Sequence, residues 1–262
     1  KTFLMGGKNG DKYAMPREKP SHKVVVDGFF IDAHEVTNKQ FKKFVDETNY
    51  VTVAERQIDW DDIKKNLPPG TEKPADLNLD PGSLIFNKQA KGVVSMQNYG
   101  QWWAWKIGAN WKQPEGPGSS IEGQDNFPVV HVAQEDALAY CKWANRRLPT
   151  EAEWESAAQG KVEDNIYSWG NKFEDLNANA NTWQGKFPME NISEDRFEYI
   201  SPVKSYPSNN IGLFDMAGNV WEMTSDLFNV NYYETLNPME VLKNPKGASK
   251  SYSPSNPYQQ EY

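Results

Sequence analysis

Glycine and proline interrupt this chain so often that long regular elements are not expected. The 262 residues include 18 Gly and 17 Pro, with clusters at 68–70, 81–82 and 114–118. Such clusters end helices and strands and begin turns. Ten Trp and an aromatic content of 13% accompany them. Rigid rings held by many turns predict a domain with long ordered loops and little regular secondary structure.

The length and the charge of the chain exclude several classes of protein. At 262 residues the chain can bury a core, and we expect one domain over residues 1–262. No apolar run approaches the roughly 20 residues of a membrane-spanning helix. The 36 acidic and 28 basic side chains give a formal charge of −8. This balance argues against nucleic-acid binding and suits a protein that binds cations.

Thiol and imidazole chemistry have few candidate residues. Cys141 is the single cysteine, which excludes an internal disulfide and a cysteine-only zinc site. We expect Cys141 to pack as a small apolar side chain. The histidines, His22, His34 and His131, lack metal-binding spacing. We expect His131, which lies between valines, to be a hydrogen-bonded core residue; no phosphate-binding glycine loop or serine elbow is visible.

Local patterns predict one hairpin and three helices. Two short apolar runs, at 24–26 and 29–32, flank Asp27-Gly28 and predict a hairpin. Capping boxes that begin at Thr37 and Thr150 predict helices that end near residues 48 and 159. A further helix is expected from Glu135 to Asn145. Its inner face is predicted to consist of Ala137, Leu138, Cys141 and Ala144.

The remaining segments are predicted to be irregular. Residues 59–123 look like one long loop in which Trp102, Trp103, Trp105 and Trp111 crowd together. We interpret this loop as an ordered insertion that the rings hold in place, although the rings could equally serve only to pack the loop down. Residues 160–226 are rich in Asn, Asp, Gly and aromatic residues. Residues 237–262 are polar, and we expect the protein to continue beyond them.

Two irregular loops have the composition of sites for hard cations. One is formed by 181–185 together with 194–197, and the other is 215–222. Calcium takes six to eight oxygen ligands, which backbone carbonyls, amides and carboxylates can supply. In the second loop Asp215 and Glu222 provide carboxylates, and Gly218 frees the backbone. The alternative is that these Asx-rich loops only satisfy their own amides.

Several strings of the sequence resemble those of the formylglycine-generating enzymes, also called sulfatase-modifying factors. The strings run in order through nearly the whole chain and include GANW at 108–111, PEGP at 114–117, PVVHV at 128–132, AYCKWA at 139–144, RLPTEAEWE at 147–155 and GNVWE at 218–222. The resemblance implies an α+β fold related to C-type lectins, with low regular secondary structure, long ordered loops and bound calcium.

The resemblance also implies two calcium sites that coincide with the two loops. By position, the first set of ligands falls on Asn181, Thr182 through its backbone, Asp195, and Phe197 through its backbone. The second set falls on Asp215, Gly218 and Val220 through their backbones, and Glu222. Trp221 matches a tryptophan that lines the active site of the family.

The chemistry of the family needs residues that this chain does not contain. The resemblance implies that a C-terminal pair of cysteines binds Cu(I), activates O₂ and oxidises a substrate cysteine to Cα-formylglycine. Cys141 matches a different cysteine of the family, so the catalytic pair is expected after Tyr262. We expect these 262 residues to omit the end of a longer protein. The implied partner is an unfolded sulfatase polypeptide that carries the motif Cys-x-Pro-x-Arg.

Other functions stay open at this level. The first alternative is a non-catalytic, calcium-stabilised, lectin-like binding or scaffold module, which applies if the cysteine pair is missing from the complete protein. Another is kinship with the iron-dependent sulfoxide synthases, whose histidine ligands the chain does not supply. Because calcium loops fill readily outside the cytosol, an exported or periplasmic location is favoured over a cytoplasmic one.

Overall fold

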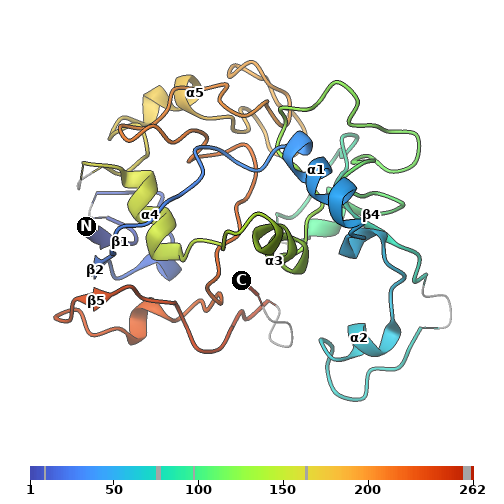
Figure 1. Cartoon of the computed structure of the whole chain (residues 1–262), viewed down its shortest axis with the longest axis horizontal. Helices are drawn as coiled ribbons and strands as arrows, with labels where there is room; N and C mark the ends of the chain where they lie inside the picture. The colour runs from blue at the N-terminus through green and yellow to red at the C-terminus, as the bar shows by residue number, and fades with distance from the viewer. Residues whose placement is uncertain (9, 75–77, 97, 163–164, 256–260) are drawn as a thin grey trace.

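Short elements joined by long loops make up the computed structural model (Figure 1). It describes all 262 residues except 9, 75–77, 97, 163–164 and 256–260. The α-helices of the described residues are α1 (Asn38–Thr48), α2 (Trp60–Lys64), α3 (Gln134–Trp143), α4 (Glu151–Gln159) and α5 (Leu176–Asn179). The strands of this part are β1 (Thr2–Met5), β2 (His22–Val25), β3 (Gly82–Phe86), β4 (Trp103–Ile107) and β5 (Leu242–Lys243). The predicted mixture of helix and strand with little regular structure is confirmed.

Two small sheets form within this part of the chain. β1 pairs antiparallel with β2, and β5 lies parallel to β2 on its other side. β3 and β4 form an antiparallel pair of their own. The hairpin predicted from residues 24–26 and 29–32 is wrong. Both edges of β2 are occupied by β1 and β5, so residues 29–32 find no partner there, and Phe30 is fully exposed.

The two capping boxes fix the starts of α1 and α4 as predicted. Thr37 accepts a hydrogen bond from the backbone of Gln40, whose side chain accepts one from the Thr37 amide at 2.8 Å. Thr150 and Glu153 repeat this exchange at the start of α4. Each box satisfies amides that have no partner within the helix. Gly160, with φ of 64°, follows α4 and ends it.

The inner face of α3 differs from the predicted one. Leu138 is about half exposed, whereas Asp136 and Tyr140 are buried. A carboxylate tolerates burial only when donors surround it. Asp136 accepts hydrogen bonds from the Tyr50 hydroxyl at 3.0 Å and from the backbone amides of Val53 and Ala133 at 3.0 and 2.8 Å. The predicted face is therefore right only in part: Ala144 packs against the core and Ala137 and Cys141 are partly buried, but Leu138 is exposed because the fully satisfied Asp136 takes a buried position instead.

Three clusters of buried apolar side chains form the core of the described residues. The first packs the β1–β2 sheet against α4 and consists of Phe3, Met5, Val24, Val26, Ala152 and Tyr233. The second joins α1 to α3 and consists of Phe41, Phe44, Val45, Trp111 and Tyr140. The third consists of Ala157, Ala158, Leu213 and Met216. Because α4 contributes to the first and third clusters, it links the N-terminal sheet to the loop that begins near residue 213.

The long segment 59–123 contains more regular structure than predicted. It includes α2 and the β3–β4 pair, and its residues 75–77 and 97 lie outside the described part. In Figure 1, α2 and its neighbouring loops extend away from the body at the lower right. Trp102 and Trp111 are buried and hold the segment in place, as expected, while Trp103 and Trp105 are largely exposed. The predicted cluster of four rings therefore splits into two anchors and two surface residues.

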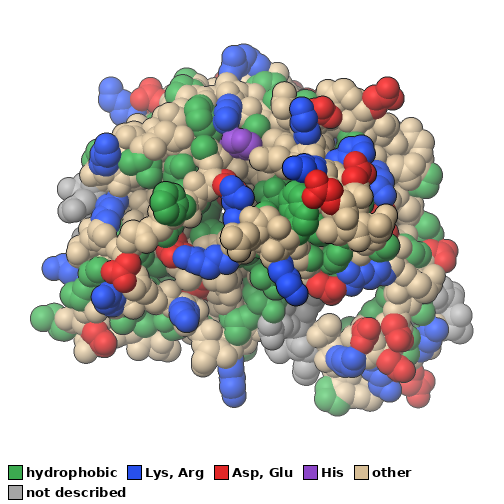
Figure 2. Space-filling model, in the orientation of Figure 1, with side chains coloured by type: hydrophobic (Ala, Val, Ile, Leu, Met, Phe, Trp, Pro, Cys, Tyr) green, Lys and Arg blue, Asp and Glu red, His purple; other side chains and the backbone are tan. Residues whose placement is uncertain are grey.

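The surface carries charges of both signs. Figure 2 shows acidic and basic side chains interspersed over the visible face, which has no large area of a single sign. None of the helices in the described part is long and apolar enough to cross a lipid bilayer.

Glu155 is a half-buried acid at the point where α4 meets the turn after β1. Its carboxylate accepts hydrogen bonds from the Gly6 amide at 3.0 and 3.2 Å and from the Gln159 side chain at 2.9 Å. Burial raises the pKa of Glu155 from its ordinary 4.5 to about 7, an effect that these hydrogen bonds only partly offset. Ionised Glu155 therefore destabilises the folded chain at neutral pH.

We predict that Glu155→Gln removes one component of the pH dependence of stability. Between pH 4.5 and 7 the unfolded state loses its proton from Glu155 first, so the free energy of unfolding falls as pH rises. The stability of the variant relative to the wild type should rise across this window by up to about 3 kcal/mol. Urea unfolding at a series of pH values measures this difference. Glu122→Gln, on the exposed surface, should show no such trend, and an equally flat difference for Glu155→Gln would contradict the assignment.

Candidate functional site

A cleft of about 1110 Å³ opens between segments that are far apart in the sequence. Its lining comes from segments within residues 28–36, 128–132 and 214–223, from α3 and α4, and from the chain between these two helices. Trp221 and Phe30 both line it and are fully exposed. Large aromatic side chains are rarely left without contacts unless a partner covers them. The cleft is therefore the leading candidate for a binding site.

The first predicted set of calcium ligands lies in loops that do not line this cleft. Asp195 is buried, and its carboxylate accepts hydrogen bonds from the Thr182 amide at 2.8 Å and the Phe197 amide at 3.1 Å. Asn181 is also buried. The Tyr206 hydroxyl donates a hydrogen bond to the Asp195 carbonyl at 2.8 Å and so helps to hold this loop. Each carboxylate oxygen keeps a second lone pair for a cation.

The second predicted set lies on a loop with an unusual backbone. Asp215, Gly218 and Asn219 all have positive φ, at 57°, 75° and 59°. One Asp215 oxygen accepts a hydrogen bond from the Lys204 amide at 2.7 Å, but the other, Oδ1, is buried without any hydrogen-bond partner. Glu222 lies on the cleft wall, where the Trp154 indole donates to it at 3.1 Å.

Asn219 connects the two loops. Its backbone amide donates to the Asn181 carbonyl at 2.8 Å, and its side-chain oxygen accepts from the Asn181 side chain at 3.0 Å. The same oxygen accepts from the Ser201 amide at 2.8 Å, and the Asn219 side-chain nitrogen donates to Glu35 at 3.0 Å. A single amide side chain thus fixes both loops and Glu35 relative to one another.

Glu35 adds a third carboxylate that the sequence did not single out. It is buried, and its second oxygen has no hydrogen-bond partner. Burial, followed by the negative charge of Asp215 and more weakly that of Glu222, raises the pKa of Glu35 well above its ordinary value. Burial also raises the pKa of Glu222, with a further contribution from Asp215. None of the three takes part in the ion pairs of the described residues.

Glu35 and the 215–222 loop together offer the oxygen ligands that a hard cation prefers. Two unpartnered buried carboxylate oxygens, Glu35 Oε2 and Asp215 Oδ1, are the atoms a cation would satisfy. No group of three His, Cys, Asp or Glu side chains in the described chain could hold a metal unaided. Amide and backbone oxygens would have to complete either site, which suits calcium rather than zinc.

The histidines and the cysteine do not gather into a site. His34 and His131 both line the cleft, whereas His22 is buried against the Tyr233 ring elsewhere. His131 is within hydrogen-bond distance of Ser83 Oγ and the Pro114 carbonyl, both at 2.8 Å, so its predicted hydrogen bonding is confirmed, but it is only partly buried on the cleft lining rather than a core residue. Cys141 is half-buried on the cleft wall, where burial raises the pKa of its thiol. The expectation of core packing for Cys141 holds only in part.

The sequence alone does not single out Glu35 or Asn219 as residues of this site. Glu35 lies two residues before the capping box of α1, where the sequence gives no reason to bury a carboxylate. Asn219 lies within the 215–222 loop that the sequence identifies, but no role is predicted for it there. A signal for Asn219 was the Gly-Asn pair itself, because both residues tolerate the left-handed backbone that turns the side chain inward.

Comparison with known proteins defines the family. A profile described as "Sulfatase-modifying factor enzyme 1-like domain" matches residues 2–260. The formylglycine-generating enzyme of Mus musculus is 42% identical over 229 residues, which cover 84% of this chain and 55% of the mouse protein. The inactive Cα-formylglycine-generating enzyme 2 of Bos taurus is 42% identical over 227 residues, 86% of this chain and 68% of the bovine protein. The chain spans about half the length of the mouse relative.

The chain therefore belongs to the sulfatase-modifying factor family, as the sequence strings predicted. The structure of PvdO from Pseudomonas aeruginosa superposes with a TM-score of 0.56 at 20% identity. The match covers 94% of this chain and 76% of the PvdO chain. At that identity the likeness is one of fold, and it is consistent with the fold of the family.

We predict that Gly218→Ala strongly destabilises the protein. Gly218 pairs with Asn181, and a Cβ at position 218 would lie 2.1 Å from the Asn181 carbonyl oxygen with φ at +75°. Strain and overpacking together should lower the free energy of unfolding by about 3 kcal/mol or more. Gly28→Ala is the control, because no heavy atom lies within 4 Å of its Cβ. Urea unfolding that gave the same stability for both variants would show that the two loops are not held as described.

Proposed function

We propose that the complete protein oxidises a cysteine of sulfatase polypeptides to Cα-formylglycine. The observation that carries the proposal is the fully exposed Trp221 on the wall of a 1110 Å³ cleft, in a chain of this family. Pockets for small ligands are typically about 300–1000 Å³. A larger, open cleft with exposed rings suits an extended peptide that binds through several side chains, such as one with the motif Cys-x-Pro-x-Arg.

The residues of this chain would bind and position the peptide. Trp221 and Phe30 offer apolar faces on which an extended peptide can bury surface. Asp32 and Glu153 line the cleft, where Asp32 pairs with Arg146 at 3.0 Å and Glu153 pairs with Arg147 at 2.7 Å. An arginine of the peptide would therefore exchange with these partners. These charges can orient a peptide that carries an arginine, because charged pairs contribute more to register and specificity than to affinity.

The reaction requires groups beyond these residues. Converting the substrate CH₂–SH to CHO is a two-electron oxidation in which the C–S bond breaks and sulfur leaves as H₂S. Full reduction of one O₂ takes four electrons, of which the substrate provides two, so a reductant such as a thiol would have to provide the other two, and one water is formed in the net reaction. Copper(I) would supply O₂ activation, but Cys141 is the single cysteine of these 262 residues and cannot form a thiolate pair. No step is therefore assigned to copper in this chain.

A non-catalytic binding module is the second candidate function, because relatives named inactive also match this chain. The identity to the inactive bovine relative equals the identity to the mouse enzyme, at 42%. Overall similarity therefore does not separate the two functions. In this alternative the cleft would still bind a polypeptide, and the candidate calcium loops would stabilise the fold without redox chemistry. A calcium-rich compartment outside the cytosol would suit both functions.

Calcium binding is proposed for both candidate functions. The first site would use Asn181 and Asp195 with the backbone oxygens of Thr182 and Phe197. The second would use Asp215 and Glu222 with the backbone oxygens of Gly218 and Val220. The bound ion of the second site would neutralise carboxylates that otherwise repel one another beside the cleft. Its role would be structural, because it would hold the 215–222 loop, and with it Trp221, in place.

We predict that Trp221→Ala in the complete protein lowers kcat/KM for a Cys-x-Pro-x-Arg peptide by about tenfold or more. The loss follows from removing an apolar contact of one aromatic side chain. Trp105→Ala is the matched control, since Trp105 is also exposed but lies on β4, outside the cleft lining. Mass spectrometry of the peptide detects the conversion of its cysteine to formylglycine.

Three results would count against this proposal. If Trp221→Ala and Trp105→Ala were equally active, the cleft would not be the peptide site. If the complete protein bound the peptide at Trp221 but never oxidised it, the non-catalytic module would be the function. Oxidation that persisted after replacement of the C-terminal cysteine pair by serine would contradict the mechanism.

We predict that Ca²⁺ raises the melting temperature of this chain. Saturation at about one hundred times Kd contributes about 2.7 kcal/mol per site, which corresponds to roughly 5 °C or more for a protein of this size. Asp195→Asn and Glu222→Gln should each remove part of the rise. Asp46→Asn, on the exposed side of α1, should leave it intact. Melting curves that do not change between excess Ca²⁺ and chelator would contradict both sites.

A further inference from the structure

A second cavity, of about 430 Å³, lies on the other side of Trp154 and Met216 from the cleft. These two side chains line both spaces and so form the wall between them. The cavity is bounded by α4, the turn after β1 and the 165–169 loop. Neither the family resemblance nor the proposed function uses it.

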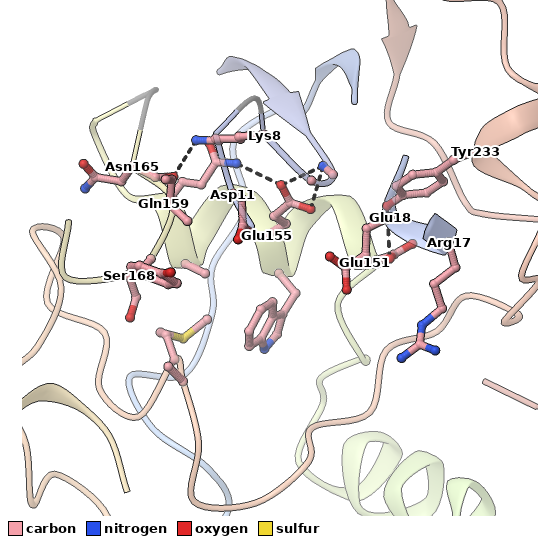
Figure 3. A pocket seen from close by; sticks show the side chains of 18 of the residues that line it. Lys8, Asp11, Arg17, Glu18, Glu151, Glu155, Gln159, Asn165, Ser168 and Tyr233 are labelled. Atoms are coloured by element: carbon pink, nitrogen blue, oxygen red, sulfur yellow. Dashed lines mark hydrogen bonds between the residues drawn. The ribbon is translucent and has the colours of Figure 1, made fainter. Parts of the chain in front are cut away.

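One face of α4 presents three acceptor side chains to this cavity. Glu151, Glu155 and Gln159 follow one another at intervals of four residues, so they lie on the same face about 6 Å apart along the helix axis. Figure 3 shows them in a row along α4, with Glu155 in the middle. The arrangement is a linear series of oxygen acceptors.

Gln159 has a side-chain oxygen that no donor among the described residues satisfies. It is 6% exposed, and its side-chain nitrogen donates to the Leu4 carbonyl at 3.0 Å and to Glu155 at 2.9 Å. Its oxygen is buried without a hydrogen-bond partner. Exchanging the amide oxygen and nitrogen would not help, because both partners of the nitrogen are acceptors. The unsatisfied oxygen therefore calls for a donor from a bound molecule.

The two glutamates also have acceptor positions to spare. An ionised carboxylate offers about four positions, and the Glu155 carboxylate accepts hydrogen bonds from the Gly6 amide and the Gln159 side chain. Glu151 accepts one hydrogen bond, from the Tyr233 hydroxyl at 3.1 Å. Burial raises the pKa of both glutamates. A cation in the cavity would relieve this penalty.

The rest of the lining favours an elongated organic cation. Tyr167 and Trp169 stack with their ring centres 4.9 Å apart and line the cavity, where they can cover methylene groups. Lys8 and Arg17 also lie on the lining, but the Lys8 ammonium donates to the Asn165 carbonyl at 2.6 Å and the Arg17 guanidinium lies over the Phe228 ring. The four acids of the lining are Asp11, Glu18, Glu151 and Glu155. They outnumber its two basic residues.

We propose that this cavity binds a linear aliphatic diamine or polyamine along the Glu151–Glu155–Gln159 face of α4. Two ammonium groups joined by four carbons lie roughly 6 Å apart, given bond lengths near 1.5 Å. This spacing matches the interval between successive acceptors on the helix. Each ammonium has three donors for the carboxylate and amide oxygens. An inorganic metal is not proposed, since the described chain holds no suitable group of three metal-binding side chains.

Isothermal titration calorimetry at physiological salt tests the proposal with three amines. 1,4-Diaminobutane should bind at least about tenfold more tightly than 1,2-diaminoethane, whose nitrogens are too close together, and than butylamine, which has one charge. Glu155→Gln and Glu151→Gln should each weaken the binding of 1,4-diaminobutane by about tenfold or more. Glu122→Gln makes the same change of charge on the exposed surface and should leave binding unchanged.

Three outcomes would overturn the proposal. Absence of binding heat for 1,4-diaminobutane would mean that water alone fills the cavity. Equal affinity for all three amines would indicate attraction to the net negative charge rather than a spaced site. Binding that survives both Glu151→Gln and Glu155→Gln would place the amine elsewhere. Because Glu151 is exposed, and a glutamine there can still accept the hydrogen bond from the Tyr233 hydroxyl, its variant stays informative if Glu155→Gln fails to fold.

Discussion

The hydrogen bonds of Asn219 organise the region around the candidate site. One amide side chain, with its own backbone N–H, ties Asn181, Ser201 and Glu35 together. Irregular loops lack the repeating backbone bonds of helices and sheets, so side chains must supply their order. The left-handed backbone at Asn219 and at the neighbouring Gly218 aims these groups inward. Without this network, the two candidate calcium loops would not be held in a fixed position relative to each other.

The same network creates an electrostatic problem. It places Glu35 beside Asp215 and Glu222, and two of their oxygens, Glu35 Oε2 and Asp215 Oδ1, are buried without partners. Carboxylates crowded in this way are unfavourable unless they are protonated or neutralised by a cation. A divalent ion would resolve the repulsion and stiffen the loop that carries Trp221. Fold stability and the shape of the cleft would then depend on the same bound ion.

Local chemistry explains which parts of the fold could be predicted from the sequence. The capping boxes at Thr37 and Thr150 identify α1 and α4 because a cap is a short-range interaction. The hairpin at 24–32 was wrong because β2 pairs with the distant β5, which no local pattern reveals. The loops of the candidate site were found through their oxygen-rich composition. Glu35 was missed because its role comes from contacts with residues about 180 positions away in the chain.

Equilibrium dialysis against radioactive Ca²⁺ tests the central claim most directly, because it counts bound ions without relying on stability or catalysis. The wild-type chain is expected to bind two Ca²⁺ ions, and either variant, Asp195→Asn or Glu222→Gln, is expected to bind one. A wild-type chain that retained no Ca²⁺ at millimolar concentration, while unfolding cooperatively, would contradict it. The crowded carboxylates would then have to be neutralised by protons alone.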